Sequence, residues 1–152
     1  MMGSEGNFQE WFKKNFPCLV LEDWRVENKL LPKQQRLEIE RWQKEGISSP
    51  PDFKIHWVTG IKYLCWVDVK WTSKIENPFN LNWGKYSNYV SVSEKTYLPV
   101  YIVLFTGEPC ENNPRAWGYI DPNGNEKIPL KDIHTFSGEI KTIKIKKGAF
   151  VK

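Results

Sequence analysis

Several features that mark common protein classes are scarce or missing in this chain of 152 residues. Its three cysteines, Cys18, Cys65 and Cys110, form no CxxC pair and leave one over, which argues against a disulfide scaffold and a zinc ribbon. The longest apolar runs, such as residues 100–105, are far below the ~20 residues of a membrane span. No charged and then apolar leader opens the sequence, so we expect a cytoplasmic protein without membrane contact.

Signature motifs of several enzyme classes are absent as well. The sequence contains no GxxxxGKS/T loop for nucleotide phosphates, and neither the GxSxG nor the HExxH motif of common hydrolases. It contains no repeat with a period of about 20 to 50 residues and no low-complexity tract. We therefore expect one domain over residues 1–152, with no nucleotide cofactor.

What the chain has in excess is aromatic side chains, at 14% of all residues, with eight Trp, eight Phe and six Tyr. Disordered chains are poor in these rings, so we expect a folded domain with a substantial core. Lys and Arg exceed Asp and Glu by 22 to 18, a net charge of +4 that is compatible with a polyanionic partner. After Glu139 the charges are all basic, at Lys141, Lys144, Lys146, Lys147 and Lys152, which suits a phosphate backbone or simply a solvated face.

The hydrophobic pattern predicts a mixed α/β domain with a sheet at its centre. Helical periodicity indicates helices at residues 4–15, 33–44 and 85–95. Runs rich in β-branched and aromatic residues indicate strands at residues 18–21, 52–58, 61–71, 100–105, 116–120 and 140–146. Residues 77–84, with one proline, three asparagines and a glycine, are expected to form a loop.

Two of the predicted helices have an apolar stripe that should face the core. In the first helix Phe8, Trp11 and Phe12 are spaced at i, i+3 and i+4. In the second helix the stripe consists of Leu37, Ile39 and Trp42.

Two carboxylates and a lysine come together in the predicted hairpin. Because the chain turns at Thr59 and Gly60, the start of the first strand lies beside the end of the second, and Asp52 returns next to Asp68. Residues i and i+2 of a strand share a face, so Asp68 and Lys70 project together. Asp52 shares that face only if it pairs opposite Asp68, which requires an odd-length turn or a β-bulge.

Such a pair of carboxylates is costly unless a cation lies between them. Mg²⁺ suits this position because it takes hard oxygen ligands and keeps several waters. Lys70 can then position or deprotonate an attacking water, or stabilise charge on a phosphorus centre, so the parts suffice for phosphodiester hydrolysis. The alternative is a solvated strand face without a role. The apolar neighbours of Asp68 argue against it, since an unpaired buried Asp is costly.

These residues match the motif of a known nuclease family. Pro51 and Asp52, followed after fifteen residues by Asp68, Val69 and Lys70, resemble the motif of the PD-(D/E)XK nuclease superfamily. Residues 62–73 look like the equivalent strand of archaeal Holliday junction resolvases. The opening residues 3–14 are similar to the first helix of that family, in which an early Glu completes the metal site.

The resemblance implies a restriction-endonuclease-like fold, a mixed central sheet flanked by helices, with its core at about residues 3–105. Two regions depart from the compact resolvases. One is an extra helical insertion before the catalytic hairpin, at residues 23–49. The other is a β-rich C-terminal extension, at about residues 107–152.

The resemblance also implies a Mg²⁺-dependent DNA endonuclease, with Mn²⁺ as a substitute metal. Glu5, Asp52 and Asp68 are then the metal ligands, and Lys70 is the catalytic lysine. Glu5 is the position that matches the family register, and Glu10 is a substitute further along the helix. Many members of the fold pair, so a homodimer is implied too.

Four lysines outside the motif are candidates for contacts with the DNA backbone. Lys74 follows the catalytic strand and Lys85 opens the next helix, so we expect both to contact phosphates beside the scissile bond. Lys144 and Lys146 should face outward from the last strand and add non-specific affinity. The aromatic residues after the motif are candidates for the core or for stacking on unpaired bases: Trp71, Trp83, Tyr86 and Tyr89.

Two other functions stay open at this stage. A non-catalytic nucleic-acid-binding module that keeps the nuclease fold would account for the basic tail and the unassigned extension. A protein-interaction domain has no support beyond the aromatic composition. Within the nuclease hypothesis, a junction, a flap, a specific duplex site and RNA are all open as substrates.

Overall fold

A six-stranded mixed sheet forms the centre of the molecule in the computed structural model, which describes residues 3–27, 30–60, 62–124 and 140–150. Three helices and eight strands cover the described residues: α1 (Ser4–Asn15), β1 (Leu19–Asp23), α2 (Lys33–Lys44), β2 (Phe53–Trp57), β3 (Tyr63–Trp71), β4 (Phe79–Leu81), α3 (Trp83–Thr96), β5 (Val100–Phe105), β6 (Ala116–Ile120), β7 (Lys141–Thr142) and β8 (Ile145–Lys147). The mixed α/β class expected from the sequence is confirmed.

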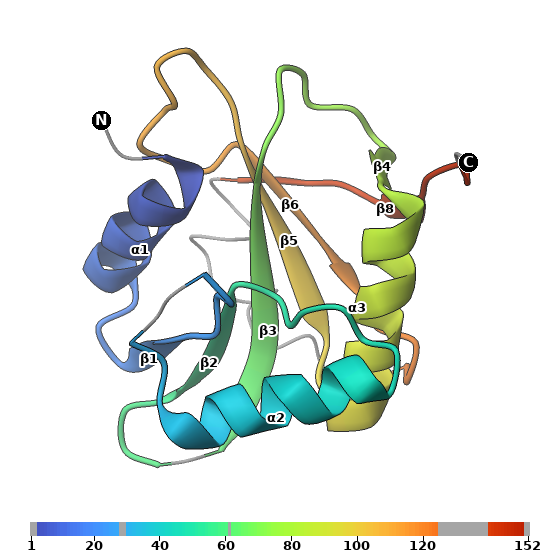
Figure 1. Cartoon of the computed structure of the whole chain (residues 1–152). Coiled ribbons are helices and arrows are strands. Elements are labelled where there is room, and N and C mark those ends of the chain that lie inside the picture. Colours follow the sequence, from blue (N-terminus) through green and yellow to red (C-terminus); the bar gives the residue numbers. More distant parts are fainter. Residues whose placement is uncertain (1–2, 28–29, 61, 125–139, 151–152) are drawn as a thin grey trace.

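The strand order of the sheet is β1-β2-β3-β5-β6-β7. Strands β1, β2 and β3 are antiparallel neighbours, whereas β5 runs parallel to β3 because α3 carries the chain back between them. Strand β6 is antiparallel to β5, and β7 is parallel to β6. A separate parallel pair, β4 and β8, lies near the start of α3 (Figure 1).

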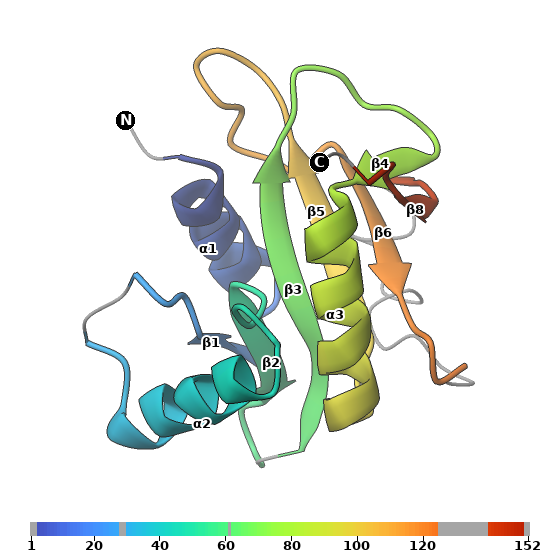
Figure 2. The ribbon, with the colours of Figure 1, turned by 45° about the vertical axis from the view of Figure 1, so that its right-hand side comes forward.

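Helices cover both faces of the sheet, with α1 on one face and α2 and α3 on the other (Figure 2). The side chains alternate along each strand and so form two separate cores. The core under α1 joins Phe8 and Phe12 to sheet residues such as Val67. The core under α2 and α3 joins Trp42 and Tyr89 to sheet residues that include Trp66 and Ile102.

The two amphipathic helices lie where the periodicity predicts them, at residues 4–15 and 33–44. The stripe of α1 is buried as expected. In α2 the residues Ile39 and Trp42 are buried, but Leu37 is 52% exposed, so its assignment to the buried stripe is wrong. Residue 37 lies two positions from residue 39, which is about 200° around a helix, and therefore points away from the sheet.

The predicted loop at residues 77–84 and the predicted strand at residues 140–146 both need correction. The loop segment contains β4 and the first turn of α3. The single strand is divided into β7, beside β6, and β8, beside β4, although Lys144 and Lys146 are exposed as expected. Of the predicted C-terminal extension, residues 125–139 and 151–152 lie outside the described residues, and so does Ile61 at the predicted start of the hairpin's second strand.

The division has a visible cause where the chain changes from one sheet to the other. Ile143 N donates to Trp117 O at 2.9 Å, and Lys144 O then accepts from Phe79 N at 2.8 Å. The crossing passes directly over Gly118, where a Cβ atom would lie 2.6 Å from Ile143 O. A side chain at this position would block the crossing, and such long-range contacts are invisible in local periodicity.

Among the described residues, the helices are all too short or too polar to cross a bilayer.

Candidate active site

The hairpin register decides whether the two aspartates meet. Phe53 pairs with Val67, so continuing the register by one residue places Asp52 opposite Asp68. The register shifts between Ile55 and His56, which is the irregularity that the sequence required. Without this bulge every residue of β2 before it would lie one position out of step with β3. Asp52 would then lie on the other face.

All four residues expected from the motif line one cavity of about 220 Å³. They come from three elements: Glu5 from the first turn of α1, Asp52 from the entry to β2, and Asp68 and Lys70 from β3. The other side chains around the cavity include Arg25, Glu27, Lys85 and Tyr89. A larger groove of about 390 Å³ between α1 and β1 is mainly apolar and has no carboxylate in its lining, so none of the motif residues lies there.

Asp68 is the most deeply buried charged group of the cavity, with 4% of the residue exposed. Its Oδ2 lies 3.5 Å from Lys70 Nζ, yet this buried oxygen accepts no hydrogen bond from the described residues. A buried carboxylate oxygen normally has a hydrogen-bond partner, because leaving it without one costs about 1–3 kcal/mol. The contact with Lys70 is therefore the interaction that offsets the burial of this oxygen.

Asp52 is held in position by the neighbouring strand. Its Oδ2 accepts a hydrogen bond from Val69 N at 2.9 Å. Burial raises the pKa of Asp52 to about 8, and the charge of Asp68 acts in the same direction; the Val69 hydrogen bond opposes them and Glu5 adds to the increase. At neutral pH the pair of aspartates therefore keeps a proton unless a cation joins it.

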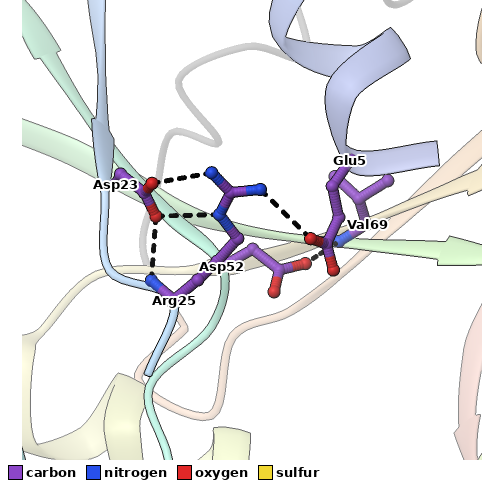
Figure 3. A network of polar contacts seen from close by, with 5 residues as sticks. All are labelled: Glu5, Asp23, Arg25, Asp52 and Val69. Carbon is purple, nitrogen blue, oxygen red and sulfur yellow. Dashed lines mark hydrogen bonds and ion pairs between the residues drawn. The ribbon is translucent and has the colours of Figure 1, made fainter. Parts of the chain in front are cut away.

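Glu5 lies at the cavity edge and is paired with Arg25 (Figure 3). Arg25 NH1 contacts Glu5 Oε2 at 3.2 Å, while Nε and NH2 contact the two oxygens of Asp23 at 2.9 and 2.7 Å. The pKa of Arg25 is raised by its hydrogen bond to Asp23, against the effect of burial and with further help from Glu5. The guanidinium group thus joins α1 to the end of β1.

The fit to a divalent cation is partial as the side chains stand. The oxygen donors of Asp52 and Asp68 suit a hard cation, and the unpartnered Oδ2 of Asp68 offers a free ligand position. However, no group of three His, Cys, Asp or Glu residues in the described parts of the chain is close enough together to hold a metal ion. Glu5, the expected third ligand, faces Arg25 instead.

Two cavity residues were not expected from the sequence. Arg25 contacts Glu5, which lies 20 residues earlier in the sequence, and no local sequence pattern predicts that contact. Tyr89 was a candidate for base stacking, but its ring is only 1% exposed, so it is a core residue beside the aspartates. Burial raises the pKa of Tyr89, and the charge of Asp68 acts in the same direction. The i, i+4 spacing from Lys85 was the signal that could have placed Tyr89 on the cavity side of α3.

The segment before Asp52 is anchored to α3 by one buried side chain. Asn88 Oδ1 accepts from Ser48 N at 2.9 Å, and Asn88 Nδ2 donates to Ser49 O at 2.6 Å. Ser49 and Pro50 line the cavity. This anchor fixes the approach of the chain to Asp52, and it joins the helical insertion to the site.

The remaining sequence candidates divide clearly. Lys85 lines the cavity from the first turn of α3, where Asn82 Oδ1 accepts from Lys85 N at 3.3 Å. Lys74, Lys144 and Lys146 are exposed and do not line the cavity, and the same is true of Glu10. Glu5 is therefore the glutamate of α1 that reaches the site.

Comparison of the chain with protein-family models, with curated proteins and with solved structures finds no match. The expected relation to the PD-(D/E)XK nucleases therefore rests on the motif residues and on the cavity they line. The chemistry has to be argued from this geometry.

Proposed function

We propose that this protein is a metal-dependent DNA endonuclease of the restriction-endonuclease-like fold. The observation that carries the proposal is the convergence of Glu5, Asp52, Asp68 and Lys70 on one cavity, although they span 65 positions of the chain from 5 to 70. The β-bulge in the hairpin places Asp52 opposite Asp68, an arrangement that a chance occurrence of the motif would not need.

The order of elements supports the same proposal. A helix with an early Glu, the hairpin of β2 and β3, a helix and then an apolar strand follow one another as the resemblance implies. The apolar strand, β5, is entirely buried and parallel to β3. The extra helix α2 packs beside this core without separating the site residues.

In the proposed site Asp52 and Asp68 would hold Mg²⁺, and Glu5 would join them once it leaves Arg25. When bound, Mg²⁺ would polarise the phosphodiester and lower the pKa of a water molecule. The raised pKa of Asp52 and the unpartnered oxygen of Asp68 are the two features of the chain that favour such a cation.

The chain's own residues would divide the remaining work. Lys70, held 3.5 Å from Asp68, would orient the attacking water or stabilise charge that develops on the phosphate. Tyr89 keeps its proton and would hold Asp68 in place. Lys85, which lines the cavity from the first turn of α3, would bind a phosphate oxygen of the DNA.

The test is cleavage of supercoiled plasmid and of branched DNA, with Mg²⁺ and with EDTA. We expect cleavage that needs the metal and is lost in Lys70→Ala. The matched control is Lys14→Ala, which removes an exposed lysine from the far end of α1. Cleavage that survives both EDTA and Lys70→Ala would contradict the mechanism. A homodimer, which would let two sites cut two strands, is part of the proposal and is checked by sedimentation.

A second candidate function is a non-catalytic nucleic-acid-binding module. The observation that favours it is the pairing of Glu5 with Arg25, together with the absence of a three-ligand group among the described residues. Calorimetric titration with Mn²⁺ separates the two candidates. A nuclease shows binding that is lost in Asp68→Asn, whereas a pure binding module shows none.

A further inference from the structure

The contact between Glu5 and Arg25 has a consequence for the way a cation enters the site. We propose that Arg25 is a built-in competitor for Glu5, so that a divalent ion completes its site by displacing the guanidinium group from this carboxylate. The inference rests on the proposed function, since it takes Glu5 as a metal ligand. It adds a resting state in which the third ligand is withheld.

Arg25 is built to stay in place without Glu5. Asp23 accepts from both Nε and NH2 of the guanidinium group and also from the backbone N of Arg25 at 2.9 Å. The guanidinium carbon lies 5.2 Å from the centre of the Phe53 ring, within the range of a cation–π contact. The side chain is therefore preorganised by Asp23 and Phe53, and the loss of one further partner would leave its position intact.

Glu5 is held far more weakly. Its contact with Arg25 is a single 3.2 Å approach, and 37% of the Glu5 side chain is exposed. An ion pair of this kind contributes little in water because solvent screens it and because two flexible side chains must be fixed. Glu5 is therefore the mobile partner of the pair, whereas Arg25 is the fixed one.

The destination of Glu5 lies in the same cavity. Glu5, Asp52 and Asp68 all line it, and Glu5 is close enough for its charge to raise the pKa of Asp52. A divalent ion between the aspartates would attract Glu5 more strongly than the single charge of Arg25 does. In the proposed exchange the side chain of Glu5 moves while its backbone stays in the first turn of α1.

The alternative is that Arg25 only ties α1 to β1. The two roles predict opposite effects on metal binding. A structural tie positions Glu5, so its loss weakens metal binding or leaves it unchanged. A competitor withholds Glu5, so its loss strengthens metal binding.

The experiment measures Mn²⁺ binding to the whole chain without DNA, by the electron paramagnetic resonance signal of free Mn²⁺. The decisive variant is Arg25→Lys, which keeps the charge in the cavity but cannot contact Asp23 through two nitrogens and Glu5 through a third. We expect Arg25→Lys to bind Mn²⁺ about two- to fivefold more tightly, the factor that corresponds to loss of a weak exposed ion pair. Arg25→Met, which also removes the charge, should bind more tightly still.

Two controls separate competition from general electrostatics. Lys85→Met removes a positive charge from the same cavity without touching Glu5, and its effect should be smaller than that of Arg25→Met. In a Glu5→Gln background the gain from Arg25→Lys should vanish, because the competitor has nothing left to withhold. If Arg25→Met does not fold, as judged by circular dichroism, Arg25→Lys alone decides the question.

The outcomes are distinguishable from failure of the proposed function. If the wild type binds Mn²⁺ and Arg25→Lys binds it equally or more weakly, the competitor role is overturned and the metal site stands. A gain that persists in the Glu5→Gln background also overturns it. If neither the wild type nor any Arg25 variant binds Mn²⁺, the metal site of the proposed function falls together with this inference.

Discussion

Two clusters of partly or fully buried charge lie on the same face of the β2–β3 hairpin, and they differ in how many partners their carboxylates have. One is the carboxylate site described above. The other, here called the Glu22 cluster, consists of Glu22, Trp24, Lys54, Tyr63 and Gln35. Lys54 is only two residues from Asp52 on the same strand, so the two clusters share a face, a strand and a core.

In the Glu22 cluster the carboxylate has several hydrogen-bond donors, although Gln35 Oε1 is buried without a hydrogen-bond partner among the described residues. Glu22 accepts hydrogen bonds from Trp24 Nε1 at 2.6 Å, from Gln35 Nε2 at 3.0 Å and from Tyr63 OH at 2.9 Å. The ammonium group of Lys54 lies 3.7 Å from the ring centre of Tyr63 and 4.8 Å from that of Trp66. Burial lowers the pKa of Lys54, and the charge of Glu22 opposes this shift. This is how a charge is buried for stability.

The carboxylate site gives its aspartates fewer partners: one hydrogen bond from Val69 N to Asp52, and one ion pair between Lys70 and Asp68. Asp68 Oδ2 accepts no hydrogen bond from the described residues, and the pKa of Asp52 is raised by burial and by Asp68. Perturbed groups without internal partners are typical of sites that bind something. The comparison therefore separates a cluster with many internal hydrogen bonds from the site to which the proposed function is assigned.

The largest expected effect on cleavage appears when one lysine of each cluster is substituted and the two variants are compared. Lys70→Ala should lower single-turnover cleavage by about 10²- to 10⁴-fold, the usual contribution of a positioned catalytic group. Lys54→Met should cleave at the wild-type rate, because Lys54 lies outside the cavity. The measurement is the cleavage rate at saturating protein, at a temperature where both variants are folded. Equal losses of cleavage rate in the two variants would contradict the assignment of separate roles to the two clusters.

The second effect is the pH dependence of stability that Asp52 causes. Its pKa is raised from 3.8 to about 8 in the folded state, so the folded protein holds the proton more tightly than the unfolded chain. The stabilising contribution is complete below about pH 4 and is lost as the pH rises through about 8. We expect a loss on the order of 3–5 kcal/mol in EDTA, measured by denaturant unfolding at several pH values.

Asp52→Asn serves as the control for this dependence. Its side-chain oxygen can still accept the hydrogen bond from Val69 N, but it has no proton to release. The free energy of unfolding of the wild type should therefore fall relative to that of Asp52→Asn between pH 4 and 8. Parallel pH profiles of the two proteins would mean that folding does not raise the pKa of Asp52.

A third effect compares a glutamate from each cluster. Glu22→Gln should destabilise the fold by about 2–3 kcal/mol, because three donors lose a charged acceptor and Lys54 loses its opposing charge. Glu5→Gln should cost roughly 0–1 kcal/mol, since it removes one exposed ion pair. Urea unfolding measures both. The order should reverse in the cleavage assay, where Glu22→Gln is active and Glu5→Gln is impaired.

The smallest effect concerns the exposed tail. Lys144→Ala and Lys146→Ala should each flatten the dependence of log affinity for DNA on log salt by about one unit, while cleavage at saturating protein stays intact. Fluorescence anisotropy at several salt concentrations measures the slope. An unchanged slope would mean that these lysines only keep the surface soluble.

Local pattern was sufficient for most of the fold. The stripe of α1 and the positions of α1 and α2 follow from apolar residues at helical spacing, and most of the strands follow from β-branched and aromatic runs. Asp52, Asp68 and Lys70 could be selected because a hairpin turn and the two-residue period of a strand are local properties as well, whereas Glu5 was chosen from the resemblance of the first helix. Even the bulge could be stated as a condition, since Asp52 and Asp68 cannot share a face without it.

What local pattern missed depends on contacts between distant segments. Arg25 pairs with Glu5 across 20 positions, Glu22 takes a hydrogen bond from Tyr63 across 41, and Asn88 holds Ser48 across 40. The tail leaves the central sheet at Gly118 because only a residue without a side chain lets Ile143 pass. Periodicity indicates which face of a helix or strand is apolar, but it does not indicate which residue from a distant segment will contact that face. The presence of buried carboxylates on the hairpin could therefore be foreseen in the chain, whereas only the packing of α1, β1 and α3 decided which partners each carboxylate finds.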